Sequence, residues 1–390
     1  MYLTREEEKI YDGEWGWAYQ VSMKILVRLG DLFGATKLIP IKSAHISGVS
    51  YKTLGDAPID FLEALARTNA KVQVPSTLNP SSFDPAYLAK NFPQEYRARQ
   101  LSITNLYKKM DVKPVFTCTP YYIHKPQPNS HLAWAESSAV MYANSVLGAW
   151  TNREGGPSAL AAALIGKTPN YGVHQAENRR ADVLVKVEVN LRNQMEYGVL
   201  GIHVGKLLKD KIPVFDGLSN YTNDCLKQLG AGLASSGMST MFRYKKSDAD
   251  RKLETISIQA ENIENTIESL STTFEVPDLV FIGCPHCSLN EVRNVAQALK
   301  GRKVRKEAKL WVCTSRHVKG KAEEYVKIIE KAGGHVLCDT CAVVTWINKL
   351  GINSMMTNSA KTAYYAPTLN RVNVRLASLD QCVNTACVKE

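Results

Sequence analysis

The chain has 390 residues, of which 45% are hydrophobic, and its formal net charge is +11. This length exceeds what one ordinary core supports, so we expect two or three domains. The positive charge is spread along the chain without a long basic block, which excludes a typical nucleic-acid-binding protein and fits an anionic small-molecule substrate or an acidic partner.

No apolar run reaches the roughly 18 residues that a membrane-spanning helix needs. The N-terminal segment 1–10 is polar and acidic, unlike a signal peptide. We therefore expect a cytoplasmic protein that does not bind membranes. Its nine cysteines would be reduced in that compartment, which favours metal-binding or catalytic roles over disulfides.

The N-terminal part of the chain predicts helices that alternate with short strands. A capping box of Thr4 and Glu7 begins the first helix. Short strands are expected at 37–41 and 72–75, and each runs into a polar loop, 43–50 and 76–80. In the first loop Gly48 would let backbone N–H groups approach a ligand, although an ordinary strand-to-helix turn explains the same residues. Further helices are expected at 19–33, 60–68 and 87–110.

Residues 131–147 are mostly small and apolar and predict a helix in which Glu136 is the one carboxylate. A buried carboxylate is costly unless it has a partner, and burial raises its pKa. Glu136 is therefore a candidate acid or base. A structural ion pair with an arginine explains this residue equally well.

The central part of the chain contains the predicted domain boundary. The glycines of Gly155-Gly156-Pro157 expose N–H groups at the start of an alanine-rich helix, 159–165, where anions bind favourably. The charged stretch 245–252 then divides the chain into an N-terminal α/β lobe, 1–250, and a C-terminal doubly wound α/β domain, 251–390. Before this boundary we expect strands at 181–191, 201–204 and 212–214 and a helix at 220–237.

The C-terminal domain has a regular alternation of strands and helices, typical of a parallel sheet. The strands are predicted at 255–259, 279–282, 308–313 and 335–337, and the helices at 261–270, 289–299, 321–332 and 343–349.

Three cysteines lie where predicted strands end, although they are far apart in the sequence. They are Cys118, Cys284 and Cys341. Ligands of α/β proteins bind outside the carboxyl ends of strands, so convergence of these ends would make a three-thiolate site. Cys313 also ends a predicted strand, and its role stays open.

The cysteine pattern has three interpretations. The Cys284-Pro-His-Cys287 sequence is typical of thiol oxidases of the thioredoxin class, although those domains are smaller and exported. A four-cysteine zinc site could add Cys338 and Cys341, although about fifty residues between the two pairs exceed the usual spacer. An iron–sulfur cluster is the third interpretation, and it alone explains Cys118.

Nine short motifs in order identify a family. They are H-I-S-G-V-S-Y at 45–51, T-L-N-P at 77–80, T-C-T-P-Y at 117–121, W-A-E-S-S-A-V at 134–140, N-S-V-L-G-A at 144–149, T-N-R-E-G-G-P-S-A-L at 151–160, I-G-C-P-H at 282–286, D-T-C at 339–341 and T-N-S-A-K at 357–361. Through them the chain resembles the aconitase X catalytic-domain family along essentially its whole length.

The resemblance implies an aconitase-like α/β fold, with several three-layer α/β/α units packed around an iron–sulfur cluster and no swivel domain. It assigns the three ligands of a [4Fe–4S] cluster to Cys118, Cys284 and Cys341 and treats Cys287 and Cys338 as variable positions. One iron then lacks a protein ligand and can act as a Lewis acid on a substrate hydroxyl.

The resemblance also implies which residues touch the substrate. Glu136 and Lys361 would be catalytic, and Lys361 would bind a carboxylate or phosphate as a point charge. Without the family match, a solvated helix lysine would be the default interpretation of Lys361. The full substrate-binding set is Gly48, Val49, Ser50, Asn79, Pro80, Glu136, Ser137 and Lys361.

The activity implied is that of a hydro-lyase. In aconitases the base is a serine on a mobile swivel domain, and the sequence ends at Glu390 without room for one, so we expect a separate small subunit that carries it. The expected reaction converts mevalonate 5-phosphate to trans-anhydromevalonate 5-phosphate, a step of isoprenoid synthesis. The alternatives are dehydration of hydroxyproline by the same family, or a non-catalytic iron–sulfur or zinc protein.

Overall fold

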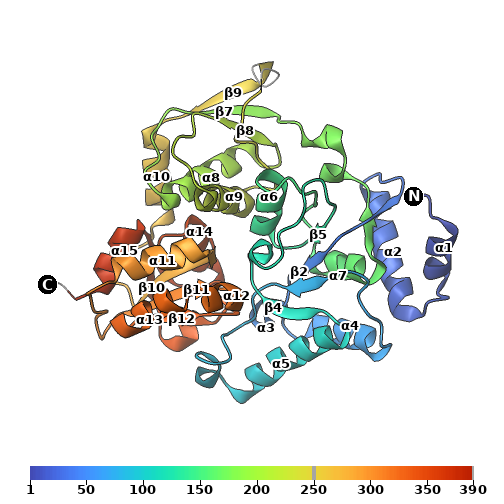
Figure 1. Ribbon diagram of the computed structural model, residues 1–390, viewed down its shortest axis with the longest axis horizontal. Helices are drawn as coiled ribbons and strands as arrows, with labels where there is room; N and C mark the ends of the chain where they lie inside the picture. The colour runs from blue at the N-terminus through green and yellow to red at the C-terminus, as the bar shows by residue number, and fades with distance from the viewer. Residues whose placement is uncertain (248–251, 389–390) are drawn as a thin grey trace.

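The computed structural model of the chain describes residues 1–247 and 252–388. These residues form three parallel sheets with helices around them, and one short antiparallel pair. Figure 1 shows the sheets in separate groups, the N-terminal group in blue and cyan, the middle group in green and yellow, and the C-terminal group in orange and red. This arrangement confirms the predicted α/β class. The predicted boundary between residues 250 and 251 lies outside the described residues.

The first sheet has four short parallel strands in the order β4–β3–β2–β5. They are β2 (Ala44–Ile46), β3 (Ser76–Leu78), β4 (Lys113–Phe116) and β5 (Ala133–Trp134). An antiparallel pair of β1 (Leu38–Pro40) and β6 (Lys167–Pro169) contacts the second helix. The helices of this part are α1 (Arg5–Asp12), α2 (Trp17–Leu32), α3 (Tyr51–Leu54), α4 (Ala57–Arg67), α5 (Gln94–Lys109), α6 (Ser137–Ser145) and α7 (Gly156–Ile165).

Local sequence patterns predict some of these elements correctly and others wrongly. The Thr4 hydroxyl accepts from the Glu7 N–H and the Glu7 carboxylate from the Thr4 N–H, which confirms the predicted capping box. The predicted strand at 72–75 is wrong, because β3 begins at Ser76. Both β2 and β3 fall in segments predicted as polar loops. Polar residues fit these buried strands because their side chains have partners, such as the Val74 carbonyl for the Ser76 hydroxyl.

The middle sheet has three parallel strands in the order β8–β7–β9. They are β7 (Val183–Val187), β8 (Pro213–Asp216) and β9 (Glu254–Ile258), with helices α8 (Gln194–Leu208), α9 (Asn223–Ser236) and α10 (Ala260–Leu270). The strand predicted at 255–259 exists as β9. It pairs with β7 in the middle sheet, which corrects its predicted place in the C-terminal sheet.

The strand predicted at 201–204 is wrong, because these residues lie inside α8. A short apolar run is typical of a buried strand and of a buried helix alike, and here it belongs to a buried helix. A Cβ on Gly201 would lie 2.3 Å from the Leu229 carbonyl oxygen of α9. Glycine at this position therefore lets the backbones of α8 and α9 touch.

The C-terminal sheet has five parallel strands in the order β12–β11–β10–β13–β14, which confirms the predicted doubly wound pattern. Its strands are β10 (Leu279–Cys287), β11 (Lys309–Thr314), β12 (His335–Leu337), β13 (Ser354–Thr357) and β14 (Asn373–Leu376). Its helices are α11 (Leu289–Ala298), α12 (Arg316–Lys321), α13 (Glu323–Ala332), α14 (Ala360–Leu369) and α15 (Leu379–Ala386).

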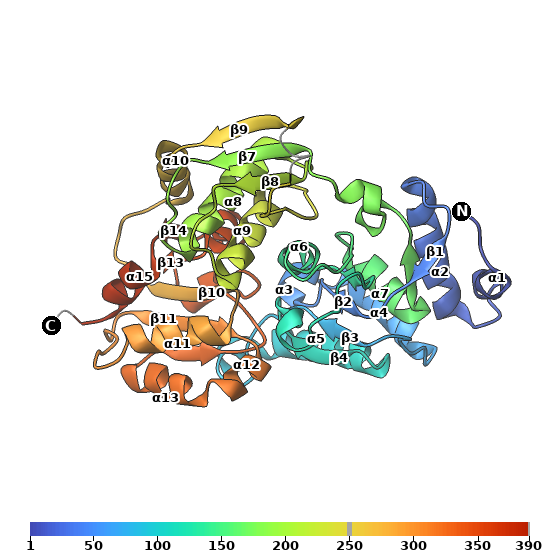
Figure 2. The same cartoon turned by 45° about the horizontal axis from the view of Figure 1, so that its top comes forward.

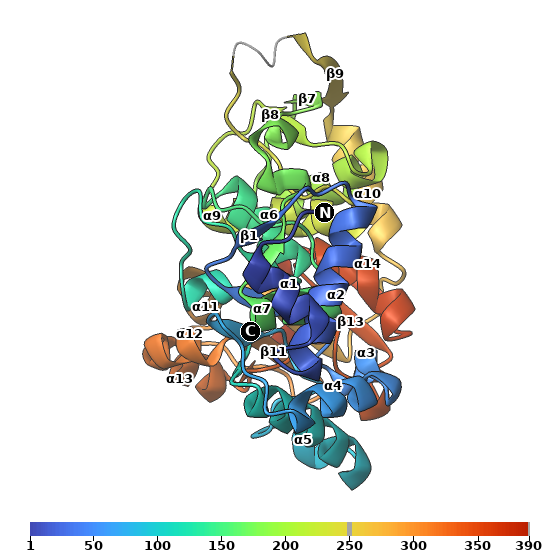
Figure 3. The same ribbon diagram turned by 90° about the vertical axis from the view of Figure 1, so that its right-hand side faces the viewer.

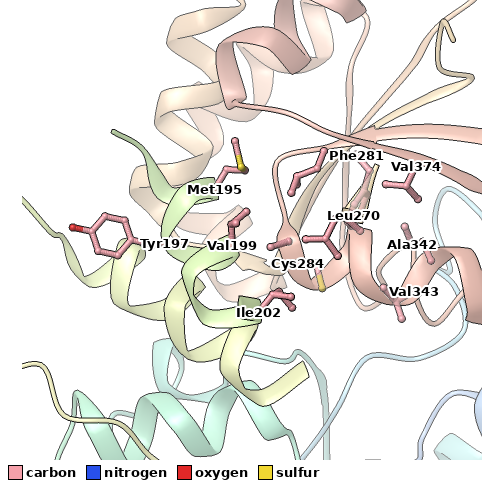
Figure 4. Close-up of a cluster of buried hydrophobic side chains, with 14 of the residues drawn as sticks. Met195, Tyr197, Val199, Ile202, Leu270, Phe281, Cys284, Ala342, Val343 and Val374 are labelled. Atoms are coloured by element: carbon pink, nitrogen blue, oxygen red, sulfur yellow. The ribbon is translucent and has the colours of Figure 1, made fainter. Parts of the chain in front are cut away.

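Side chains of β10 alternate between two cores, as expected for a strand covered on both faces. Val280 and Ile282 pack with α11 and α13, whereas Leu279 and Phe281 belong to the core that β10 shares with α8, α9 and α14. Figure 2 shows α11 and α13 on one side of this sheet and α8 and α9 on the other. Figure 4 shows Phe281 and Cys284 close to side chains of α8, so the middle unit packs directly on the C-terminal sheet.

The predicted helix at 343–349 is wrong. The chain turns there and forms only the 3-10 helix Ile347–Leu350. The Asn370 side chain donates to the carbonyls of Ala342 and Thr345, at 3.0 and 2.9 Å. This side chain replaces the backbone donors that a helix would have supplied.

Figure 3 shows the molecule from the side, with the middle sheet at one end and α5 at the other. No helix in residues 1–247 or 252–388 has the length and apolar character needed to cross a membrane.

Candidate active site

The structure brings together the three cysteines that were selected at strand ends. Cys118 follows β4, Cys284 lies in β10 and Cys341 follows β12, and all three are buried. The thiols of Cys284 and Cys341 interact with each other, which lowers the pKa of Cys284 and raises that of Cys341. Burial, followed by the charges of Glu136 and Cys284, raises the pKa of Cys118. The Cys118 sulfur accepts a hydrogen bond from the backbone N–H of His286 at 3.1 Å.

Gly283 allows β10 to reach this position. Its φ is 114°, a value that residues with a Cβ rarely adopt, and a Cβ there would lie 2.3 Å from the Cys313 carbonyl oxygen of β11. Cys313 therefore belongs to the sheet beneath the site. The strand can bend over it and present Cys284 only because position 283 is glycine.

The arrangement of thiols does not support a zinc site. In the described part of the chain, no three His, Cys, Asp or Glu side chains are placed to hold a single metal ion, and all nine cysteines are free. Cys287 packs in the apolar core beneath α11, and the Cys338 N–H donates to Asp84. The two CxxC spacings therefore do not form a common site.

The thiols of Cys118, Cys284 and Cys341 fit a larger group, an iron–sulfur cluster. Three buried thiols on separate segments are the donor set that such clusters use. The hydroxyl of Thr340, next to Cys341, is buried and has no hydrogen-bond partner in the described residues. A buried polar atom of this kind normally has a partner, which a bound group beside Cys341 would supply.

Glu136 and Lys361 form a buried ion pair beside the thiols. Glu136 precedes α6 and caps it, rather than lying within the predicted helix 131–147. The Lys361 Nζ lies 2.6 Å from the Glu136 Oε1 and donates also to the Ser138 hydroxyl at 3.2 Å. The Asn79 amide donates to the other carboxylate oxygen at 2.8 Å, and the Ser138 hydroxyl donates to Oε1 at 2.7 Å.

These contacts overturn the expected pKa of Glu136. Burial alone would raise this pKa, but the Lys361 ammonium and the hydrogen bonds from Ser138 and Asn79 outweigh burial and lower it to about 2. The partner is a lysine, not the arginine considered from the sequence. Lys361 is only 9% exposed, so it is no solvated helix lysine, and the Glu136 charge raises its pKa in spite of burial.

His45 extends this network and was not selected from the sequence. Its Nδ1 lies 2.8 Å from the Thr77 hydroxyl and its Nε2 lies 3.4 Å from the Asn79 Oδ1. Because Asn79 gives its amide N–H to Glu136, its oxygen accepts from His45, which is then protonated at Nε2. Burial lowers the pKa of His45 to about 4. The available signal was its position at the start of the motif at 45–51.

The loop after β2 offers backbone donors. Within the described chain, the N–H groups of Gly48, Val49 and Ser50 have no hydrogen-bond acceptor. Gly48 turns the loop with a φ of 73°. Consecutive N–H groups of this kind form concave sites for anions. The close approach of α7 supports the loop, since a Cβ on Gly156 would lie 2.6 Å from the Ser47 carbonyl oxygen.

The hydroxyl of Ser50, a residue of the expected substrate-binding set, already has hydrogen-bond partners within the fold. It is buried, donates to the Val344 carbonyl at 2.8 Å and pairs with the Ser82 hydroxyl at 3.0 Å. Lys52 adds bonds to the carbonyls of Val343 and Thr345. The loop is therefore fastened to the segment that follows Cys341.

The remaining predicted residues lie at the same place. Pro80 is buried after Asn79, and Ser137, at the first position of α6, is half-buried and has no side-chain partner among the described residues. The Lys361 charge influences the pKa of both Cys118 and Cys284. The structure thus groups the ion pair and the thiols in one buried site. Their individual roles toward a substrate stay predictions.

The lowered pKa of Glu136 leads to a first prediction. A carboxylate with a depressed pKa stabilises the fold above its ordinary value of 4.5, and this contribution is lost as pH falls toward about 2. We expect Glu136→Gln to reduce the stability of the chain by roughly 3 kcal/mol from pH 5 to pH 10, with the difference shrinking below pH 4.5. Urea unfolding of both proteins across this range measures it. A difference that grows as pH falls from 8 to 6 would show a raised pKa instead.

Comparison with known proteins gives matches along the whole chain. Three family models match in order: the aconitase X first domain at residues 1–177, the second domain at 181–268 and the third domain at 277–388. The crystal structure of aconitase X from Thermococcus kodakaraensis, in its holo-form, superposes with a TM-score of 0.93 at 42% identity. The match covers 99% of this chain and 100% of that one, which confirms the aconitase-like fold.

Curated relatives of two activities are similar to this chain. The phosphomevalonate dehydratase large subunit of Methanocaldococcus jannaschii is 48% identical, with 98% of this chain and 99% of that protein covered. The protein of the same name from Thermococcus kodakarensis is 43% identical, with 99% and 100% covered. The cis-3-hydroxy-L-proline dehydratase of Pseudomonas aeruginosa is 33% identical, with 98% and 70% covered.

Proposed function

The chain belongs to the aconitase X family, and we propose that it is the large subunit of a dehydratase that acts on mevalonate 5-phosphate. One observation carries the choice of substrate. Relatives named phosphomevalonate dehydratase large subunit match over nearly their full length at up to 48% identity, whereas the hydroxyproline dehydratases match at 33% and 31%. The name of the closer relatives also implies a small subunit as partner.

The unpaired donors of the site support an anionic substrate. The N–H groups of Gly48, Val49 and Ser50 suit a phosphate or a carboxylate. Lys361 has three N–H donors, and in the described chain Glu136 and Ser138 accept from two of them, which leaves one for the substrate. The positive net charge of +11 attracts such a molecule.

The thiols support the proposed cofactor. Cys118, Cys284 and Cys341 would hold a [4Fe–4S] cluster, which supplies a Lewis-acidic iron for a hydroxyl that must leave. These residues fit the group because they are buried thiols on three converging segments. Lys361 lies close enough to affect two of them electrostatically, so a substrate held by Lys361 lies near the same thiols.

Dehydration breaks the carbon–oxygen bond of the hydroxyl and removes a proton from the adjacent carbon, which leaves a double bond and water. Glu136 is unsuited to take that proton, because its pKa of about 2 makes it a weak base. We assign Glu136 the task of holding Lys361 charged and oriented. The base would come from a serine on the small, swivel-domain subunit.

The geometry weakens the hydroxyproline alternative. A hydroxyproline site needs a carboxylate partner for the positively charged ring nitrogen, and Glu136 is the carboxylate that could supply it. Both of its oxygens already accept hydrogen bonds, from Lys361 and Ser138 at one oxygen and from Asn79 at the other. An additional cation would have to share Oε2 with Asn79 and would lie close to the Lys361 ammonium, which repels it.

The proposed function predicts an activity that depends on two chains. We expect the purified large chain, reconstituted anaerobically with iron and sulfide, to show no dehydratase turnover alone. With the small subunit present, mevalonate 5-phosphate should be dehydrated faster than hydroxyproline. Product formation by both preparations on both substrates measures this. Turnover by the large chain alone, or faster turnover of hydroxyproline, would contradict the proposal.

A further inference from the structure

One imidazole links all three segments that carry the clustered thiols. His286 follows Cys284 by two residues, and its backbone N–H donates to the Cys118 sulfur at 3.1 Å. Its ring Nδ1 lies 3.1 Å from the hydroxyl of Thr117, the neighbour of Cys118. Its Nε2 lies 2.9 Å from the carbonyl of Thr340, the neighbour of Cys341. The residue is fully buried.

The hydrogen bonds fix one tautomer of this ring. A carbonyl oxygen can only accept, so Nε2 carries the proton and donates to Thr340. Nδ1 must then accept from the Thr117 hydroxyl, and that hydroxyl in turn accepts from the Thr119 N–H at 3.1 Å. Every polar atom of the ring therefore has a partner of the correct kind. The imidazole is neutral and cannot rotate without breaking two buried hydrogen bonds.

A buried charge group holds the backbone of His286 from the other side. The Lys227 ammonium donates to the His286 carbonyl at 3.3 Å and is paired with Glu291 and, at 3.6 Å, with Asp224. Lys227 belongs to α9 of the middle unit. His286 is thus held at its backbone N–H, its backbone carbonyl and both ring nitrogens.

We propose that His286 is a positioning residue for the iron–sulfur cluster: it holds the three thiol-bearing segments at their mutual spacing and directs a backbone N–H at the Cys118 sulfur. This inference rests on the cluster of the proposed function. Partners behind metal ligands orient those ligands, and their loss commonly weakens metal affinity 10- to 100-fold. Hydrogen bonds to ligand sulfurs also set the reduction potential of a cluster, since they stabilise the more negative, reduced state.

The test compares the complete chain with three variants. His286→Leu removes both ring hydrogen bonds, and His286→Gln keeps an amide that can reach the Thr340 carbonyl. His203→Leu is the matched control, because its ring also bonds a threonine hydroxyl, at 3.0 Å to Thr266, but lies in α8 outside the thiol-bearing segments. All proteins are reconstituted anaerobically. The measurements are the rate of iron loss to a chelator, the midpoint potential and the electron paramagnetic resonance spectrum of the reduced cluster.

We expect His286→Leu to lose iron about tenfold faster than the unchanged chain, with a lower midpoint potential and an altered spectrum. His286→Gln should recover part of each change, and His203→Leu should match the unchanged chain. If His286→Leu does not fold, the inference is tested by the midpoint potential of the cluster in His286→Gln. Unaltered potential and iron loss in the His286 variants would overturn this inference alone. Failure of the unchanged chain to take up iron would overturn the cluster assignment itself.

Discussion

Replacing Lys361 with alanine is expected to lower kcat/KM for mevalonate 5-phosphate by about two orders of magnitude in the reconstituted two-chain enzyme. The change removes one charge-assisted hydrogen bond to an anionic group, which is worth a few kcal/mol in a buried site. It also leaves the Glu136 carboxylate buried with only Ser138 and Asn79 as partners. Steady-state kinetics of the two-chain enzyme measures the loss.

A double variant separates the loss of activity from a loss of stability. Removing one partner of a buried ion pair costs roughly 3–5 kcal/mol, because the other charge stays unpaired. Lys361→Ala with Glu136→Gln avoids this buried charge, so it should unfold at a higher urea concentration than Lys361→Ala while its kcat/KM stays low. Lys349→Ala, which removes an exposed lysine that contacts Tyr96, is the control. Unchanged kcat/KM in Lys361→Ala would remove Lys361 from the site.

Single replacement of Cys118, Cys284 or Cys341 by alanine is expected to abolish stable iron binding and dehydratase activity. Each change deletes one of three thiolates, and too few ligands remain to hold a cluster. The matched controls are Cys287→Ala, which removes a thiol packed in the apolar core, and Cys338→Ala, which removes another buried thiol. Both should keep their iron and lose only some stability.

Iron and sulfide per chain, together with visible absorption, distinguish the five variants. Loss of iron in Cys287→Ala or Cys338→Ala, with iron retained in Cys118→Ala, would restore the pairing of the two CxxC sequences and contradict the ligand assignment. Thermal unfolding of the metal-free proteins shows whether each variant folds. A variant that folds but takes up no iron has lost a ligand rather than its structure.

The convergence of the thiols could be predicted because strand ends mark ligand crevices in parallel sheets. Position in a regular α/β pattern pointed to Cys284 and Cys341 but also to Cys313, and the family resemblance chose among them. The ionisation of Glu136 could not be predicted in this way. Its partner Lys361 is 225 residues away, and only tertiary packing decides whether a buried carboxylate meets an ammonium or stays alone.

The errors in secondary structure have physical causes of the same kind. The apolar run around Gly201 is typical of both a buried strand and a buried helix, and the choice depends on contact with α9. The strand β9 was found, but its place beside β7 depends on chain reversal through two helices, which no local pattern encodes. His286 was part of a recognised motif. Its role became visible only when Thr117 and Thr340 were seen beside it.

The attachment of the loop after β2 to the segment that follows Cys341 has a consequence for synthesis on the ribosome. Ser50 and Lys52 bond to carbonyls 294 and 293 residues later, in the segment that follows Cys341. Domains generally fold in order as they emerge, so the N-terminal unit must wait for its last contacts until nearly the whole chain has been translated. Under the proposed function, a cluster held by Cys341 and the other two thiols could be inserted only after this segment has been made, so chains that end before it would lack a complete site.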